Sequence, residues 1–222
     1  LGSPSFPMPG YEIDILDADG AVLPAGELGA IAVKLPLPPS CLATIWGADE
    51  AYVEKYLTSF PGYYETGDAG YCDEDGYLYI MARTDDVINV AGHRLSTGQL
   101  EEVLADHPDV AECAVIGVAD QLKGQLPLGL ICLYPNCNRL QDDIMAEAVA
   151  LVKDRVGRVS SFNLIVVIER LPKTRSGKVL RGTMAKIADG ENWNMPATID
   201  DPAILDEIKM ALQSIGYASG KS

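Results

Sequence analysis

A compact group of cations lies in the stretch Leu171–Lys178, which reads LPKTRSGK. Three of its eight residues are positively charged, in a chain whose formal net charge is −15. Ser176-Gly177 favours a flexible turn that carries Lys178. Such a loop could bind a phosphate or a carboxylate, although charge alone fits a solvated surface loop as well. A nucleotide-binding P-loop is excluded, because Val179 stands where that motif needs Ser or Thr.

Two further motifs carry side chains that suit a nucleotide. Tyr64–Asp68 (YETGD) places a carboxylate just after a glycine, and an acceptor-only group there suits the two hydroxyls of a ribose. Arg83–Arg94 (RTDDVINVAGHR) begins with opposite charges and ends with a glycine, which permits close backbone approach, and a guanidinium. Taken singly, the Gly-Asp pair and the Gly92-His93-Arg94 stretch are more often plain turns, and the charges at Arg83–Asp86 also fit a local ion pair. Their meaning therefore depends on their order along the chain.

The composition is that of an ordinary globular protein. The 222 residues could form one large domain or two small ones, and 48% of them are hydrophobic and 22% charged. An excess of acids, 32 Asp and Glu against 17 Lys and Arg, argues against nucleic acid as the main partner. No apolar run reaches the length of a membrane span. The five cysteines form no C-x-x-C pair and suggest no zinc site, so we expect reduced thiols in a cytoplasmic or mitochondrial-matrix protein that is not secreted.

The first part of the chain is rich in short strands. Apolar and polar residues alternate in 11–17, ahead of a hairpin-type turn at Asp19-Gly20. Further strands are predicted at 28–35, 63–71 and 77–81, and a short helix near 50–57. Strands of this length with regular turns predict a β-rich unit over residues 1–84.

The pattern changes after residue 84. Strands are predicted at 87–90, 111–118, 126–134 and 164–168. Helices are predicted after Ser96, which fits a capping box with Gln99, and at 141–156 and 179–188. These elements predict a small α+β unit, a short sheet flanked by helices, over 85–192. A polar link and a helix at 203–215 make up 193–222, so the predicted fold class is α+β.

The motifs, taken together and in this order, resemble the C-terminal part of the adenylate-forming (AMP-binding) enzymes. That family includes acyl-CoA synthetases, peptide-synthetase adenylation domains and luciferases. The form NVAGHR is most similar to the short-chain branch, the acetate and propionate CoA ligases. Other stretches similar to that branch are 33–39, 60–64, 120–128 and 199–202. The resemblance implies a distorted, barrel-like β subdomain followed by a mobile α+β C-terminal domain.

The resemblance also implies a role for the charged motif residues. Lys178 matches the lysine that serves adenylation, and Asp68 matches the carboxylate that binds ribose. Arg83 and Arg94 match arginines near the ribose and the phosphates. Asp85 matches the hinge about which the C-terminal domain rotates between two half-reactions.

A second group of residues matches the site at which CoA reacts. Ala91 and Gly92 match the residues that line the pantetheine tunnel. Relatives often carry Ser at the position of Ala91, so this sequence departs mildly from the pattern. Lys153 stands where a relative has an arginine near the CoA 3′-phosphate, and a lysine lacks the bidentate guanidinium fork.

The implied reaction converts a short carboxylate, propionate or acetate, with ATP and CoA into acyl-CoA, AMP and pyrophosphate through acyl-AMP. The intact enzyme would use Mg²⁺, and we expect no ligand to be tightly bound to this chain and no protein metal site. The first residue, Leu1, and the Pro-rich opening suggest a piece of a longer protein, and nothing in 1–62 resembles the family's phosphate loop or substrate pockets. We therefore expect the missing N-terminal domain to be a partner and this chain alone to be inactive. Two alternatives stay open: an adenylation domain that loads a carrier protein, and a non-catalytic interaction module.

Overall fold

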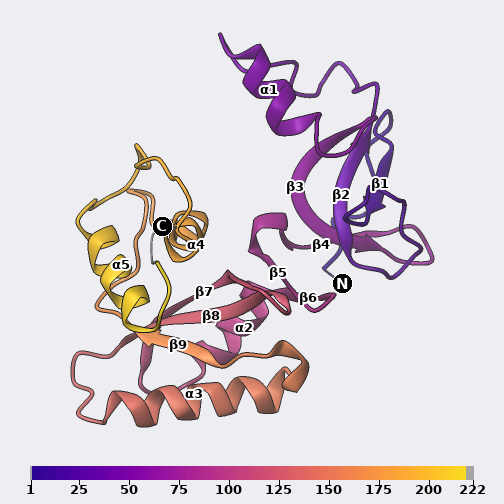
Figure 1. Cartoon of the computed structure of the whole chain (residues 1–222). Coiled ribbons are helices and arrows are strands. Elements are labelled where there is room, and N and C mark those ends of the chain that lie inside the picture. The colour runs from indigo at the N-terminus through magenta and orange to yellow at the C-terminus, as the bar shows by residue number, and fades with distance from the viewer. Residues whose placement is uncertain (1, 219–222) are drawn as a thin grey trace. The chain divides into compact units, whose positions relative to one another are not determined.

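The computed structural model describes residues 2–218 and, at Asp85, the backbone alone (Figure 1). Contacts within the chain divide it into two units, residues 1–85 and residues 86–222. Each unit has its own sheet and its own buried residues. The two units are therefore described one at a time.

The first unit is built on a four-stranded antiparallel sheet. The strands β1 (Ile13–Leu16), β2 (Gly29–Lys34), β3 (Tyr63–Cys72) and β4 (Leu78–Arg83) follow one another in space as they do in sequence. Side chains of Ile15, Ile31 and Leu78 form its small core. The helix α1 (Asp49–Tyr56) contacts β3. The sheet therefore places the end of β4, and with it Arg83, beside the middle of β3.

The second unit is a five-stranded sheet with helices on both faces. Its strands are β5 (Val87–Val90), β6 (His93–Ser96), β7 (Val110–Asp120), β8 (Gly124–Leu133) and β9 (Leu164–Val167). The order is β6-β5-β8-β7, and β9 runs parallel to β8. In Figure 1, α2 (Thr97–Ala105) and α3 (Gln141–Arg155) cover one face, and α4 (Arg181–Ala188) and α5 (Ile204–Ser214) cover the other.

Alternation along the strands explains why both faces are covered. Ala114 and Ile116 of β7 belong to the core under α4 and α5, whereas Val115 between them belongs to the core under α2 and α3. The same alternation separates Leu130 from Ile131 on β8. Strands buried on both faces read as continuous apolar runs, which is how β7 and β8 appear in the sequence. Phe162, fully buried, closes the second core.

The predicted fold class, α+β, is confirmed, with local corrections. The strand β6 was not predicted. Ser96 does hold the N-cap position of α2, but its side chain makes no capping hydrogen bond, so the predicted capping box is wrong. The helix α4 begins at Arg181 rather than at Val179, because the residues before it are paired in a hairpin. None of the helices in residues 2–218 combines the length and apolar character needed to cross a bilayer.

Candidate functional site

Lys178 lies near the tip of a hydrogen-bonded hairpin that joins β9 to α4. The two arms pair through the bridge Lys173–Val179 and through the N–H of Leu180, which donates to the carbonyl of Pro172 at 2.9 Å. Gly177, with φ of +85°, completes the turn between the arms in a conformation that suits glycine. The Lys178 side chain is exposed and has no hydrogen bond or ion pair among the described residues. A rigid turn thus presents an unneutralised ammonium to solvent.

Thr174 organises this turn, a role that sequence reasoning missed. Its backbone N–H donates to the carbonyl of Lys178 at 2.8 Å, and its carbonyl accepts from the N–H of Gly177 at 2.8 Å. Its hydroxyl oxygen accepts from the N–H of Lys178 at 3.0 Å and lies 3.0 Å from the hydroxyl of Ser176. The spacing of a threonine four residues before the lysine was the available signal.

Asp68 and Arg83, predicted to act on a nucleotide, do lie together in the first unit. They are opposite each other on β3 and β4, and Nη1 of Arg83 is 3.3 Å from Oδ1 of Asp68. Thr66 holds the backbone of β3 near Asp68 against β2. Its hydroxyl donates to the carbonyl of Ile31 at 2.6 Å and accepts from the N–H of Asp68 at 3.1 Å. The Asp68 side chain remains one-third exposed, so part of its carboxylate is available to a hydroxyl donor.

A shallow pocket of about 340 Å³ lies beside this pair, between α1, β3 and the end of β4. Its wall includes Tyr56 and Tyr64, whose rings stack with centroids 5.1 Å apart. Burial, with Tyr56 as a neighbour, raises the pKa of the Tyr64 phenol, which therefore stays neutral at physiological pH. Arg83 lines this pocket and is also the partner of Asp68 in the ion pair.

The turn at Ala91 and Gly92 joins β5 to β6 in the second unit. Both residues are exposed and have positive φ, +49° and +87°. No described atom beyond its chain neighbours lies within 4 Å of the position that a Cβ on Gly92 would take. The N–H of Ala91 donates to the carbonyl of Lys123 at 2.8 Å, which ties this turn to the β7–β8 turn. The result is a fixed backbone turn with open space beside it.

The remaining predicted residues also have defined places. Arg94 lies on β6 opposite Asn89 and is partly buried. Lys153 is a partly exposed residue of the last turn of α3. Asp85 lies in the short 3₁₀ helix Thr84–Asp86, and its side chain is outside the described part of the chain.

The lysine hairpin and the Ala91-Gly92 turn are attached to opposite ends of β7. At one end, Nζ of Lys173, which pairs with Val179 in the hairpin, lies 2.7 Å from Oε1 of Glu112. At the other end, Gly124 pairs with Asp120 and also with Val90, the residue before the turn. Asp120 lies eight positions after Glu112, which is about 26 Å of strand at roughly 3.3 Å per residue. The second unit therefore carries two separate candidate surfaces.

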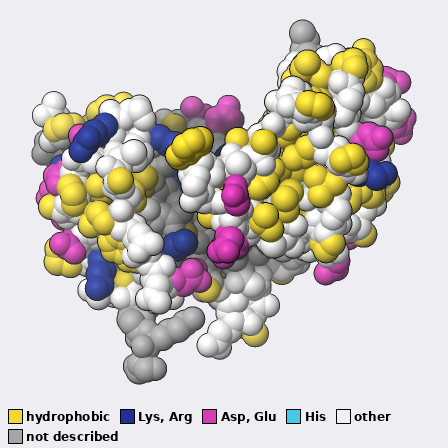
Figure 2. Space-filling view, turned by 90° about the horizontal axis from the view of Figure 1, so that it is seen from above, with side chains coloured by type: hydrophobic (Ala, Val, Ile, Leu, Met, Phe, Trp, Pro, Cys, Tyr) yellow, Lys and Arg dark blue, Asp and Glu magenta, His cyan; other side chains and the backbone are white. Residues whose placement is uncertain are grey.

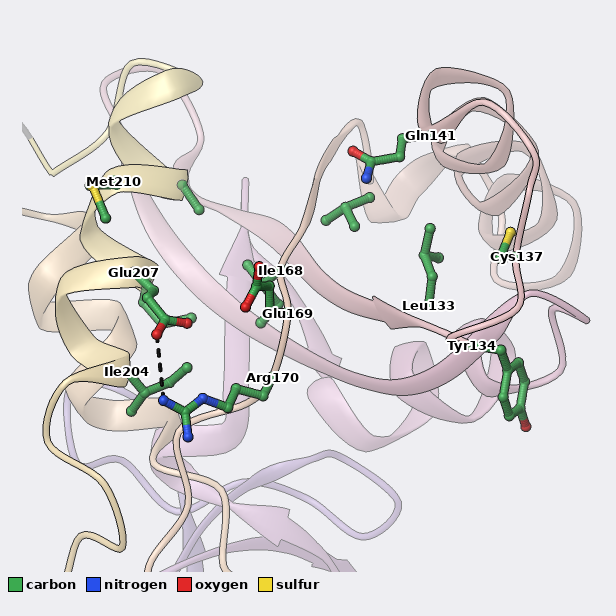
Figure 3. Close-up of a pocket in the computed structure, with 13 residues that line it drawn as sticks. Leu133, Tyr134, Cys137, Gln141, Ile168, Glu169, Arg170, Ile204, Glu207 and Met210 are labelled. Carbon is green, nitrogen blue, oxygen red and sulfur yellow. Dashed lines mark hydrogen bonds and ion pairs between the residues drawn. The ribbon is translucent and has the colours of Figure 1, made fainter.

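One pocket of the second unit contains none of the predicted site residues. About 650 Å³ in volume, it lies between α5, the ends of β8 and β9, and the start of α3 (Figure 3). Glu207 points into it and is paired with Arg170, at 3.4 Å between Oε1 and Nη2, while Leu133, Ile168 and Met210 supply apolar wall. No motif from the sequence reaches this pocket, so its size does not make it the candidate site.

The first unit exposes many hydrophobic side chains, as Figure 2 shows over its visible face. They include Met8, Trp46 and Met81, and Trp46 is fully exposed. An exposed apolar surface of this kind is typical of one that binds another protein or domain. Among the described residues, no group of three or more His, Cys, Asp or Glu side chains is arranged to hold a metal ion.

Comparison with known proteins identifies a family for part of the second unit. The family described as the AMP-binding enzyme C-terminal domain matches residues 99–178, a range that ends at Lys178. Residues 99–178 therefore belong to this C-terminal domain of the AMP-binding enzymes. The predicted resemblance to the C-terminal part of the short-chain acyl-CoA synthetases is confirmed by the relatives of this domain.

Three curated relatives cover nearly the whole chain. An uncharacterised protein of Pseudomonas aeruginosa is 55% identical over 96% of this chain and 34% of its own length. Acyl-CoA synthetase short-chain family member 3, mitochondrial, of Mus musculus is 46% identical over 93% of this chain and 30% of its own length. The propionate–CoA ligase of Escherichia coli K12 is 43% identical over 96% of this chain and 35% of its own length. The chain thus spans about a third of the length of these relatives.

Solved structures agree on the fold. The acetoacetyl-CoA synthetase from Streptomyces lividans superposes with a TM-score of 0.79 over 97% of this chain and 33% of that protein, at 20% identity. The anthranilate CoA ligase AuaEII, solved with anthranoyl-AMP, superposes with a TM-score of 0.61 over 85% of this chain and 35% of that protein, at 28% identity. The adenylate-forming fold of both units is therefore shared with enzymes that differ widely in sequence.

Proposed function

We propose that this chain is part of an AMP-forming short-chain acyl-CoA synthetase whose substrates are ATP, CoA and a small carboxylate, propionate or acetate. The observation that carries the proposal is the exposed, unpaired ammonium of Lys178 on a hairpin fixed by Thr174. Asp68 and Arg83 in the first unit support it, because they join an acceptor for ribose hydroxyls to a cation for phosphate.

In the first half-reaction, a carboxylate oxygen of the acid attacks the α-phosphorus of ATP. A new O–P bond forms, the bond to the β,γ-diphosphate breaks, and acyl-AMP and pyrophosphate result. Two anions must approach each other, so the ammonium of Lys178 lowers the barrier by offsetting their repulsion and the charge that develops on the phosphoryl group. Asp68 accepts hydrogen bonds from the ribose, and Arg83 lies beside the same nucleotide.

In the second half-reaction, the thiol of CoA loses its proton and its sulfur attacks the acyl carbon. The C–S bond forms, the bond from the acyl carbon to the phosphate oxygen breaks, and AMP leaves. The open turn at Ala91 and Gly92 admits the pantetheine arm where a larger side chain would block it. Lys153 meets the CoA phosphate, Arg94 meets the nucleotide, and Asp85 is the hinge between the two arrangements.

The missing N-terminal domain is the main protein partner in this proposal. Exposed apolar side chains such as Trp46 and Met81 on the first unit support it, because a folded neighbour would cover them. Mg²⁺ would arrive with ATP, and we assign it no protein ligand in this chain. One relative is named as mitochondrial and another comes from a bacterium, which fits a matrix or cytoplasmic enzyme. The chain alone should be inactive, since most of the acyl and adenine pockets lie outside it.

The experiment is a ligase assay on a full-length protein that contains this chain, with a panel of C2 to C8 carboxylates. We expect AMP and pyrophosphate to appear with acyl-CoA, in equal amounts, and propionate or acetate to be turned over fastest. Product that forms on a carrier protein while CoA is ignored would instead identify a carrier-loading adenylation domain. Turnover of no carboxylate with either acceptor would reject the ligase and leave an interaction module.

A further inference from the structure

An ion pair holds the residue at which α4 begins, three positions after Lys178. Nε and Nη2 of Arg181 each donate to one carboxylate oxygen of Glu101 on α2, both at 2.8 Å. The side chain of Glu101 is 15% exposed and that of Arg181 is 25% exposed, so water screens the pair only in part. Hydrogen bonding to Glu101 also raises the pKa of the Arg181 guanidinium. A bidentate, partly buried pair of this kind fixes orientation as well as distance.

Glu101 also binds the sheet directly. Within residues 2–218, β7 pairs with β8 on one side alone, so the N–H groups along its other edge have no partner strand. One of them, the N–H of Val115, donates to Oε1 of Glu101 at 2.8 Å. A second, the N–H of Ala119, donates to Oδ1 of Asp189, the residue that ends α4, at 2.8 Å. Both ends of α4 are thereby attached to the edge of β7.

The segment that links Arg181 to Lys178 is short and held by hydrogen bonds. Between Lys178 and Arg181 only Val179 and Leu180 intervene, and both are paired with the opposite arm of the hairpin. Asp86, in the 3₁₀ helix that leads into this unit, adds its negative charge to the field at Arg181. The carboxylate of Glu101 is therefore the point at which α2, β7 and the start of α4 meet, directly after the lysine hairpin.

We propose that Glu101, acting through Arg181, is a positioning residue for Lys178. It holds the base of the hairpin on the edge of β7 and so sets where the ammonium stands when the acid attacks ATP. This inference rests on the proposed function for its catalytic consequence, whereas the restraint of the hairpin does not. Displacement of a catalytic group by about 1 Å can cost about a hundredfold in rate, which gives the restraint a measurable effect.

The first arm of the test measures amide hydrogen exchange of residues 173–180 in this chain. Glu101→Gln keeps an oxygen that can accept from Val115, but it replaces the oxygen that accepts from Nη2 of Arg181 with an NH₂ donor. We expect exchange in the hairpin to rise about tenfold or more in this variant and in Arg181→Gln, with an intermediate rise in Arg181→Lys. The matched control is Glu147→Gln, which breaks a carboxylate–arginine pair to Arg139 in the same unit, away from the hairpin. Its hairpin exchange should not change.

The second arm measures the two half-reactions in a full-length ligase that contains this chain. Glu101→Gln should lower carboxylate-dependent pyrophosphate exchange about ten- to a hundredfold and change thioester formation from supplied acyl-AMP less than about twofold. Arg181→Lys should restore part of the loss. A merely structural role would lower both half-reactions together.

Three outcomes overturn the inference or its basis. Unchanged hairpin exchange in Glu101→Gln means that the pair does not restrain the hairpin. Faster exchange with equal losses in both half-reactions means that the restraint does not serve Lys178. If the unmodified ligase makes no acyl-AMP at all, the proposed function fails, and the exchange arm still decides whether Glu101 holds the hairpin.

Discussion

Replacing Lys178 with alanine should separate the two half-reactions of the proposed enzyme. The ammonium is exposed and unpaired among the described residues, so its removal should change the free energy of unfolding by less than about 0.5 kcal/mol. Its effect on adenylation is electrostatic. Two unit charges about 4 Å apart at an effective dielectric constant of about 20 interact by about 4 kcal/mol. At about 1.4 kcal/mol per factor of ten, the rate of acyl-AMP formation should fall about a thousandfold.

Two assays on a full-length ligase that contains this chain test this value. Carboxylate-dependent exchange of pyrophosphate into ATP reports adenylation, and release of AMP from supplied acyl-AMP with CoA reports thioester formation. Thioester formation should change less than about threefold, because the proposed second arrangement uses the turn at Gly92 rather than Lys178. Urea titration checks that the variant is folded.

Arg175 provides the matched control for this prediction. It is an exposed cation on the same hairpin, and its backbone N–H bonds to Thr198 whatever its side chain is. Arg175→Ala removes the same charge and should alter neither half-reaction by more than a few-fold. Equal losses of both half-reactions in Lys178→Ala, or equal effects of the two variants, would show that Lys178 has no specific role in adenylation.

Three further predictions concern the two units separately. Gly67→Ala in the full-length ligase should raise the KM for ATP about tenfold, because φ is +77° there and the added Cβ would lie 2.6 Å from Nη2 of Arg83, forcing it away from Asp68. Phe162→Ala should lower the free energy of unfolding of the second unit by about 3–5 kcal/mol in urea titrations, since this fully buried ring fills the core under α2 and α3. Burial raises the pKa of the Cys132 thiol to about 11, so the unfolded chain loses this proton at lower pH than the folded chain. The free energy of unfolding should therefore fall as the pH rises from about 9 to about 11. Urea titrations at pH 8.5 and pH 10.5 should show a smaller fall for Cys132→Ala.

Local patterns predicted most of the elements. The apolar run that forms β9 and the helical spacing of Ile144, Ala148 and Val152 in α3 were sufficient, because period and burial are local properties of the sequence. The strand β6 escaped prediction because HRLS is short and partly polar, and it is a strand through pairing with β5. The start of α4 was misplaced for the same reason: Val179 is helix-compatible, but its hairpin partner Lys173 determines its conformation.

In the candidate site, too, contacts between residues near in sequence could be predicted, and contacts between residues far apart in sequence could not. The motif around Lys178 is contiguous, and Thr174 could have been identified within it. The pair Glu101–Arg181 spans 80 residues, and neither residue lies within YETGD, RTDDVINVAGHR or LPKTRSGK. Asp68 and Arg83 were each predicted to lie near a nucleotide, but their direct pairing follows from the register of β3 with β4. Contacts made by tertiary pairing leave no trace in a single sequence read by spacing alone.

The geometry of β7 bears on how one small domain could serve two reactions. The hairpin of Lys178 is attached at Glu112 and, through Glu101, at Val115, whereas the Ala91-Gly92 turn is attached next to Asp120. Even the nearer attachment, Val115, is five residues from Asp120, or about 16 Å along a strand of roughly 3.3 Å per residue. Reacting groups must come within about 3–3.5 Å of each other. Attachment points this far apart on one strand favour different placements of the second unit in the two half-reactions of the proposed enzyme, and the chain passes from one unit to the other at Asp85.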